Sequence, residues 1–122
     1  MTDEIFADRV ARVRERFVST LEAKLDETWA AVPKLGDVAP PSVAVPAVAE
    51  AYLRIHGIVG IGRTVGFPET GRAALVVEDV LRLPYRAARG LTSDEISLLK
   101  NSLQSLRAVA ARELQSLHSL PQ

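Results

Sequence analysis

Apolar residues recur every three or four positions along most of the chain, and this spacing predicts four amphipathic helices and no strands. The first predicted helix runs from about Asp3 to Val32, with an inward stripe of Phe6, Val10, Val13, Phe17, Leu21 and Leu25. The second is expected from Pro46 to Val65, and the third from Pro68 to about Leu83. The fourth begins after Thr92, which can form a capping box with Glu95.

Proline and glycine mark the connections between these helices. Residues 33–46 contain Pro33, Gly36, Pro40, Pro41 and Pro46, which predict a proline-rich crossover loop. The Gly66-Phe67-Pro68-Glu69 segment predicts a tight turn with a positive φ at the glycine, and Pro84 and Gly90 bracket the last loop. We therefore expect one all-α domain over residues 1–122, an antiparallel four-helix bundle with a long N-terminal helix.

Composition narrows the class of protein. Hydrophobic residues make up 48% of the 122 residues and charged residues 25%, a globular balance. Fifteen basic side chains match fifteen acidic ones, so the basic excess of a nucleic-acid binder is missing, and the lack of cysteine excludes thiol chemistry. The N-terminus shows no leader pattern, and no uninterrupted apolar run is long enough to span a bilayer. These features predict a cytoplasmic monomer without a nucleic-acid or membrane partner.

Five of the seven glycines lie between Leu53 and Arg72, and three of them, Gly57, Gly60 and Gly62, are inside the second predicted helix. Glycine in a helix interior costs about 0.5 to 1 kcal/mol relative to alanine, so these three positions need a reason. Gly62 lies on the inward stripe, where a small residue lets a neighbouring helix come close. Gly57 and Gly60 lie off that stripe, and we expect them to leave room for a molecule that approaches from outside.

Helical geometry places His56 beside this open surface. At about 100° per residue, Gly60 lies about 40° from His56 around the axis, and Arg63 lies about 20° from it on the other side. Ile55 is about 100° away, toward the core. His56 is therefore expected to be exposed above a residue without a side chain, where a bulky partner can reach the imidazole.

The spacing of these residues resembles that of histidine phosphotransfer (HPt) domains of two-component phosphorelays. In that family a phospho-accepting histidine is followed four residues later by glycine, as Gly60 follows His56, and ten residues later by a glycine-led turn. The Gly66-Phe67-Pro68-Glu69 turn meets this second spacing, and Arg72-Ala73-Ala74 and Glu78-Asp79 are similar to the family's third helix. The resemblance covers the two central helices, while the outer helices agree only in being amphipathic.

The resemblance implies a phosphocarrier without kinase activity of its own. His56 would accept a phosphoryl group on Nε2 from the aspartyl phosphate of a receiver domain, in a hybrid histidine kinase or a response regulator. It would then pass the group to another receiver. The chain needs no cofactor of its own, since Mg²⁺ is expected in the partner receiver domain. Supporting positions would be Gly57, Val59, Gly60 and Arg63, and docking positions Leu53, Arg54 and Ile61.

One departure from the family leaves other interpretations open. The family usually has lysine three residues after the histidine, and this chain has Val59; Arg63 and Arg54 are the candidates to supply the missing cation. An alternative is a degenerate HPt-like docking module that binds a kinase or receiver without carrying phosphate. A third is an unrelated structural bundle. An exposed apolar rim formed by Leu53, Val59 and Ile61 would suit the first two functions, and a buried His56 the third.

Overall fold

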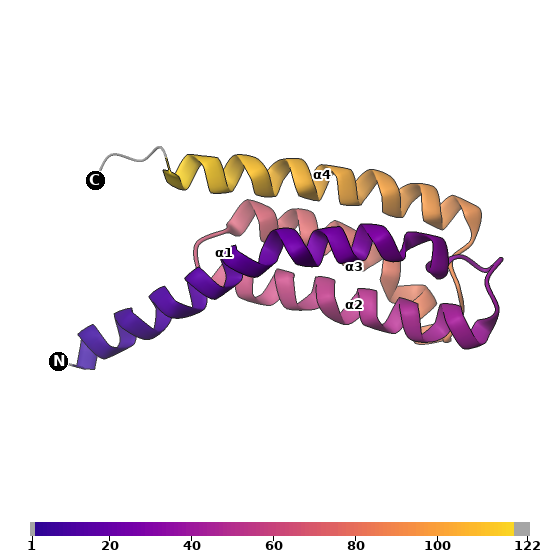
Figure 1. Ribbon diagram of the computed structural model, residues 1–122, viewed down its shortest axis with the longest axis horizontal. Helices are drawn as coiled ribbons and strands as arrows, with labels where there is room; N and C mark the ends of the chain where they lie inside the picture. The colour runs from indigo at the N-terminus through magenta and orange to yellow at the C-terminus, as the bar shows by residue number, and fades with distance from the viewer. Residues whose placement is uncertain (1, 119–122) are drawn as a thin grey trace.

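The protein is a bundle of four helices, as the sequence predicts. The computed structural model describes the backbone of residues 2–118 and the side chains of residues 4–116. The helices are α1 (Thr2–Leu35), α2 (Pro41–Thr64), α3 (Pro68–Ala87) and α4 (Ser93–His118). They run alternately in opposite directions, and each packs on two neighbours in the order α1–α2–α3–α4–α1 (Figure 1). This is an antiparallel four-helix bundle.

A single apolar core runs along the inside of the bundle. Full burial of one large apolar side chain contributes about 1.5 to 3 kcal/mol, so this core is the main source of stability. Its largest side chains are Phe67, Leu21, Leu35, Ile55, Ile58, Leu81, Leu91, Leu99, Leu103 and Leu106. α2 has the length and composition of a possible membrane-spanning helix, with 24 residues and a mean hydropathy of 1.2 over its most apolar stretch. In the bundle, its apolar face forms part of this core.

The predicted crossover loop over residues 33–46 is wrong, because Pro33 and Pro46 both lie inside helices. The connection between α1 and α2 is only residues 36–40. A proline within a helix removes one backbone hydrogen bond, but both prolines are exposed, so a carbonyl that loses its partner there faces water. Leu35 and Ala44 are fully buried in the same turns, and their packing stabilises the extra helical residues.

α3 also continues beyond its predicted end near Leu83, through Pro84 to Ala87. Its C-terminus is closed by Ala88, which adopts the left-handed conformation with φ of 52°. The backbone N–H of Arg89 donates to the carbonyl of Pro84 at 3.1 Å, and the N–H of Ala88 donates to that of Tyr85 at 3.2 Å. These two hydrogen bonds form a Schellman motif, so α3 ends after Pro84 and not at it.

The N-terminal part of α1 extends past the other helices (Figure 1). Phe6 and Val13, expected in the inward stripe, are 69% and 44% exposed, whereas Phe17, Leu21 and Leu25 are buried as predicted. The reason is the position of the chain reversal, since α2 ends at Thr64 and α3 begins at Pro68. Beyond that turn, no helix within residues 2–118 covers the apolar stripe of α1.

The turn between α2 and α3 has the predicted geometry. Gly66 adopts a φ of 95°, and the N–H of Phe67 donates to the carbonyl of Gly62 at 2.7 Å. The start of α3 is capped from a distant helix, because the carboxylate of Glu113 in α4 accepts from the N–H of Glu69 (3.1 Å) and of Thr70 (2.8 Å). This carboxylate also accepts from the Thr70 hydroxyl at 2.6 Å, so α4 fixes where α3 begins.

The capping box at the start of α4 is confirmed. The N–H of Glu95 donates to the Thr92 hydroxyl at 3.2 Å, and the N–H of Thr92 donates to Glu95 Oε1 at 2.9 Å. Arg89 adds an ion pair to the same carboxylate at 2.7 Å. The hydrogen bond from Arg89, followed by those from Thr92, lowers the pKa of Glu95 from 4.5 to about 2.

Substitution of Glu95 by glutamine should therefore lower stability in a pH-dependent way. Because the folded pKa is below the unfolded one, the contribution of Glu95 is fully present above pH 4.5 and is lost as the pH falls through about 2. We expect Glu95→Gln to cost about 1 to 2 kcal/mol at pH 7, allowing for partial exposure. Urea unfolding at pH 7 and pH 2.5 should show this difference shrinking, and a constant difference would contradict the assignment.

Candidate functional site

His56 lies on the outer surface of α2, and a buried carboxylate from α3 holds its ring. The His56 side chain is 63% exposed, whereas that of Glu78 is only 5% exposed. The imidazole Nδ1 is hydrogen-bonded to Glu78 Oε1. A carboxylate only accepts hydrogen bonds, so the chemistry of this pair assigns the ring proton to Nδ1. The lone pair of the neutral imidazole is then on Nε2, the nitrogen that Glu78 leaves free.

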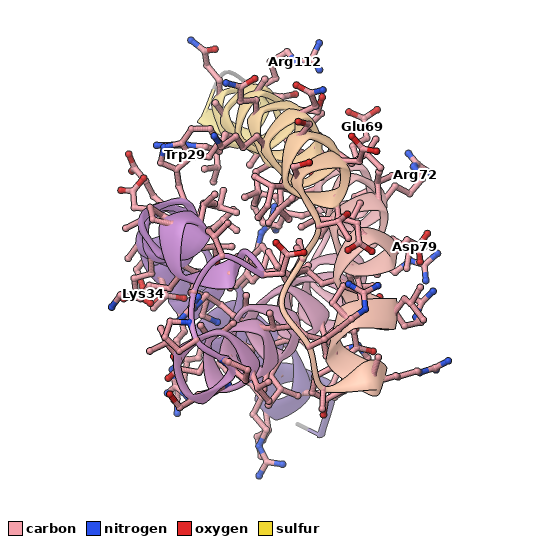
Figure 2. The ribbon with its side chains drawn as sticks, turned by 90° about the vertical axis from the view of Figure 1, so that its right-hand side faces the viewer. Trp29, Lys34, Glu69, Arg72, Asp79 and Arg112 are labelled. Atoms are coloured by element: carbon pink, nitrogen blue, oxygen red, sulfur yellow. The ribbon has the colours of Figure 1, made fainter. Side chains whose placement is uncertain are left out.

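Arg82 holds the other side of the Glu78 carboxylate. Its guanidinium lies 3.7 Å from Glu78 Oε2 and makes a closer ion pair with Asp79 at 2.7 Å. Viewed along the bundle, Asp79 projects outward from α3 (Figure 2). The hydrogen bond to Asp79, together with one to Tyr52, raises the pKa of Arg82 above its ordinary value. A permanent cation therefore stands beside the carboxylate that binds His56.

The imidazole stacks on a pair of tyrosine rings, one from α2 and one from α3. Tyr52, one turn before His56, stacks on its ring with centroids 5.9 Å apart and planes inclined by 13°. Tyr85 of α3 stacks in turn on Tyr52, with centroids 4.3 Å apart and planes inclined by 10°. These contacts, together with the bond to Glu78, restrict the rotation of an otherwise exposed side chain.

Close packing of α2 on α3 brings His56 and Glu78 within reach of each other. A Cβ at Gly71 would lie 2.9 Å from Cγ of Arg63, and one at Gly62 would lie 3.6 Å from the nitrogen of Gly71. Gly62 is buried against α3 as predicted, although a Cβ there would make contacts of ordinary length, and the tight position is Gly71. Gly71 precedes Glu78 by seven residues, two helical turns, so both lie on the face of α3 that meets α2.

The surface next to His56 is open, as the glycine positions predict. A Cβ placed at Gly57 or at Gly60 would meet no atom within 4 Å outside its own helix. Leu53, one turn before Gly57, is 58% exposed and adds an apolar side chain to this side of α2. The surface beside the imidazole is therefore open at Gly57 and Gly60 and carries the apolar side chain of Leu53.

The expected apolar rim is smaller than predicted. Val59 is buried, with 8% exposure, because it lies about 60° from His56 on the side that faces α3. Ile61 is 37% exposed, but it lies about 140° from His56 around α2 and does not share its face. Of the three residues expected in the rim, only Leu53 lies both exposed and on the His56 side.

The structure separates the two arginines considered as substitutes for the family's lysine. Arg54 is directed to α1, where it donates to the Thr28 hydroxyl at 3.2 Å and pairs with Glu27 at 3.5 Å. Arg63 is exposed, and among the side chains of residues 4–116 it has no ion-pair partner. It also lies within about 20° of His56 on the helix surface, so Arg63 is the cation that shares the face of the histidine.

The sequence analysis noted Glu78 only as part of an acidic pair and did not place it in the site. A signal for its role was present in the spacing of α3. Glu78 follows Ala74 by four residues and precedes Leu81 by three, so it occupies a position of the buried stripe. A buried carboxylate requires a polar partner within reach, and the imidazole of His56 is that partner.

Comparisons with known proteins give no match for this chain, whether with protein-family models, curated proteins or solved structures. The geometry around His56 and the spacing of residues in α2 and α3 are therefore the basis for assigning a function.

Proposed function

We propose that this protein is a phosphorelay intermediate that carries a phosphoryl group on Nε2 of His56. It accepts the group from the aspartyl phosphate of one receiver domain and passes it to another. The observation that carries the proposal is an imidazole whose side chain is 63% exposed and whose Nδ1 is bound by a buried carboxylate. An imidazole fixed in this way is a nucleophile that needs no separate general base.

The proposed transfer is a single in-line displacement. The Nε2 lone pair attacks phosphorus, a new N–P bond forms, and the bond between phosphorus and the receiver's carboxylate oxygen breaks. The aspartate leaves as a carboxylate, and the ring proton stays on Nδ1, which donates a hydrogen bond to Glu78. Such transfers depend mainly on positioning and charge neutralisation. The receiver would supply Mg²⁺, so this chain needs to contribute only the ring and a docking surface.

The surroundings of His56 support access by a large partner. The open positions at Gly57 and Gly60 let another protein approach the free edge of the ring, and exposed Leu53 offers an apolar contact. Arg63 is the candidate to neutralise the phosphoryl charge in place of the family's lysine. The exposure of His56 weighs against a purely structural bundle, in which a histidine of this kind would be buried.

A docking module that binds a receiver without carrying phosphate is the second candidate. Val59 favours it, because a buried valine stands where the family has a phosphate-neutralising lysine. A docking module would use the same exposed surface of α2 to bind its partner, but the imidazole of His56 would not react.

The proposal is tested by acid-labile phosphate uptake from a panel of phosphorylated receiver domains. Wild-type protein should gain label, whereas His56→Ala should gain none while keeping the helical circular dichroism spectrum of the wild type. Rapid uptake from one receiver would also identify the donor. If no receiver delivers phosphate although some bind, the docking module replaces the phosphocarrier as the function.

A further inference from the structure

We infer that Glu78 is a positioning residue that makes Nε2 the reacting atom of His56 and compensates the positive charge that the ring gains on phosphorylation. The inference deepens the proposed function and rests on it, because it describes how the same site works. It is carried by the bond between Glu78 and Nδ1, the burial of the carboxylate and the position of Arg82.

Glu78 selects the ring nitrogen of His56 that reacts. A neutral imidazole carries one proton that can occupy Nδ1 or Nε2, and only the nitrogen without it has a lone pair for attack. Glu78 accepts a hydrogen bond at Nδ1 and thereby favours the form with the lone pair on Nε2. Since the ring is largely exposed, Nε2 is the nitrogen that is both unprotonated and accessible.

Phosphorylation also changes the charge of the imidazole ring. When Nε2 bonds to phosphorus, the ring that still carries a proton on Nδ1 becomes positively charged. The Glu78 carboxylate is shielded from water, so its attraction for this charge is stronger than at an exposed site. The closer partner of Arg82 is Asp79, at 2.7 Å against 3.7 Å for Glu78, which leaves Glu78 available to the ring.

Glu78 also occupies an unusual position in the fold for a carboxylate. It lies in the buried stripe of α3 between Ala74 and Leu81, where an apolar side chain would fill the same space. Burial of a carboxylate is unfavourable unless it is paired, and an apolar replacement of similar volume is often neutral for stability. A carboxylate kept in this position is therefore better explained by its action on His56 than by packing.

The test uses phosphoramidate, a small donor whose P–N bond breaks to release ammonia as Nε2 bonds to phosphorus. We expect wild-type protein to give phosphohistidine at Nε2 alone, as read by ³¹P NMR. Glu78→Gln, which keeps the shape but removes the charge, should react about tenfold more slowly and give some product at Nδ1. Glu113→Gln is the matched control, since it changes another carboxylate that contacts α3 and should keep the wild-type rate and product.

Glu78→Leu provides a second variant that should fold, because it continues the apolar stripe of α3, and it should react at least as slowly as Glu78→Gln. Wild-type rate and product in both Glu78 variants would overturn the inference, as would a wild-type His56 that does not react at all. Phosphoramidate replaces the receiver, so the two proposals can fail separately. Labelling that depends on Glu78, with no transfer from any receiver, would remove the relay function and leave the role of Glu78 in place.

Discussion

Replacement of Phe67 by alanine is expected to lower the free energy of unfolding by about 3 to 5 kcal/mol. The Phe67 ring is fully buried at the turn between α2 and α3, with the ring of Phe17 at 5.3 Å and the guanidinium of Arg14 at 5.8 Å. The backbones around it already pack closely at Gly62 and Gly71, so the cavity cannot collapse without moving helices. Urea unfolding followed by circular dichroism measures the loss.

Phe6→Ala is the matched control for this prediction. It removes the same ring from α1, but Phe6 is 69% exposed on the part of the helix that extends beyond the bundle. Its unfolding free energy should stay within about 0.5 kcal/mol of the wild type. Equal losses in the two variants would mean that the N-terminal stripe of α1 packs against something in solution, contrary to the structure.

Gly60→Leu is expected to slow phosphoryl transfer from a receiver by about tenfold or more, a loss of about 1.4 kcal/mol or more of productive docking. The new side chain would rise from the open surface one turn from His56 and keep a large partner away from Nε2. The bundle itself should not suffer, since a side chain at Gly60 meets no atom within 4 Å outside its own helix. Leucine should even raise stability by up to about 0.8 kcal/mol through its helix propensity.

Two controls separate docking from the reactivity of the ring. Ala108→Leu places the same side chain at an exposed position of α4, a helix that makes no contact with α2, and should retain most of the transfer rate. Labelling of Gly60→Leu by phosphoramidate should stay close to the wild type, because that reagent is too small to be blocked. An unchanged rate of transfer from the receiver in Gly60→Leu would contradict the proposed docking surface.

The features that the sequence predicted correctly are those that depend on neighbours within a few residues. The capping box of Thr92 and Glu95 is formed by two side chains and two amides of the same turn. The positive φ of Gly66 follows from the absence of a Cβ and needs no knowledge of the rest of the fold. The exposure of His56 follows from its angle to the buried stripe of its own helix.

Distant packing decided the features that the sequence predicted wrongly. Pro33 and Pro46 are unfavourable in helices by local rules, yet the burial of Leu35 and Ala44 stabilises the turns that contain them. The stripe of α1 has the same spacing throughout, but Phe6 lies beyond the chain reversal and has no helix to pack against. Periodicity shows which face of a helix is apolar but not how far along that face a neighbour extends.

The sequence by itself determined four amphipathic helices, one open surface on α2 and an exposed histidine within it. It could not determine what holds the histidine, because His56 and Glu78 are 22 residues apart on different helices. Their contact exists only when α2 and α3 pack closely in one register, which Gly62 and Gly71 allow by lacking side chains. The exposed position of His56 therefore follows from its own helix. The hydrogen bond that holds the ring at Nδ1 depends on the tertiary structure.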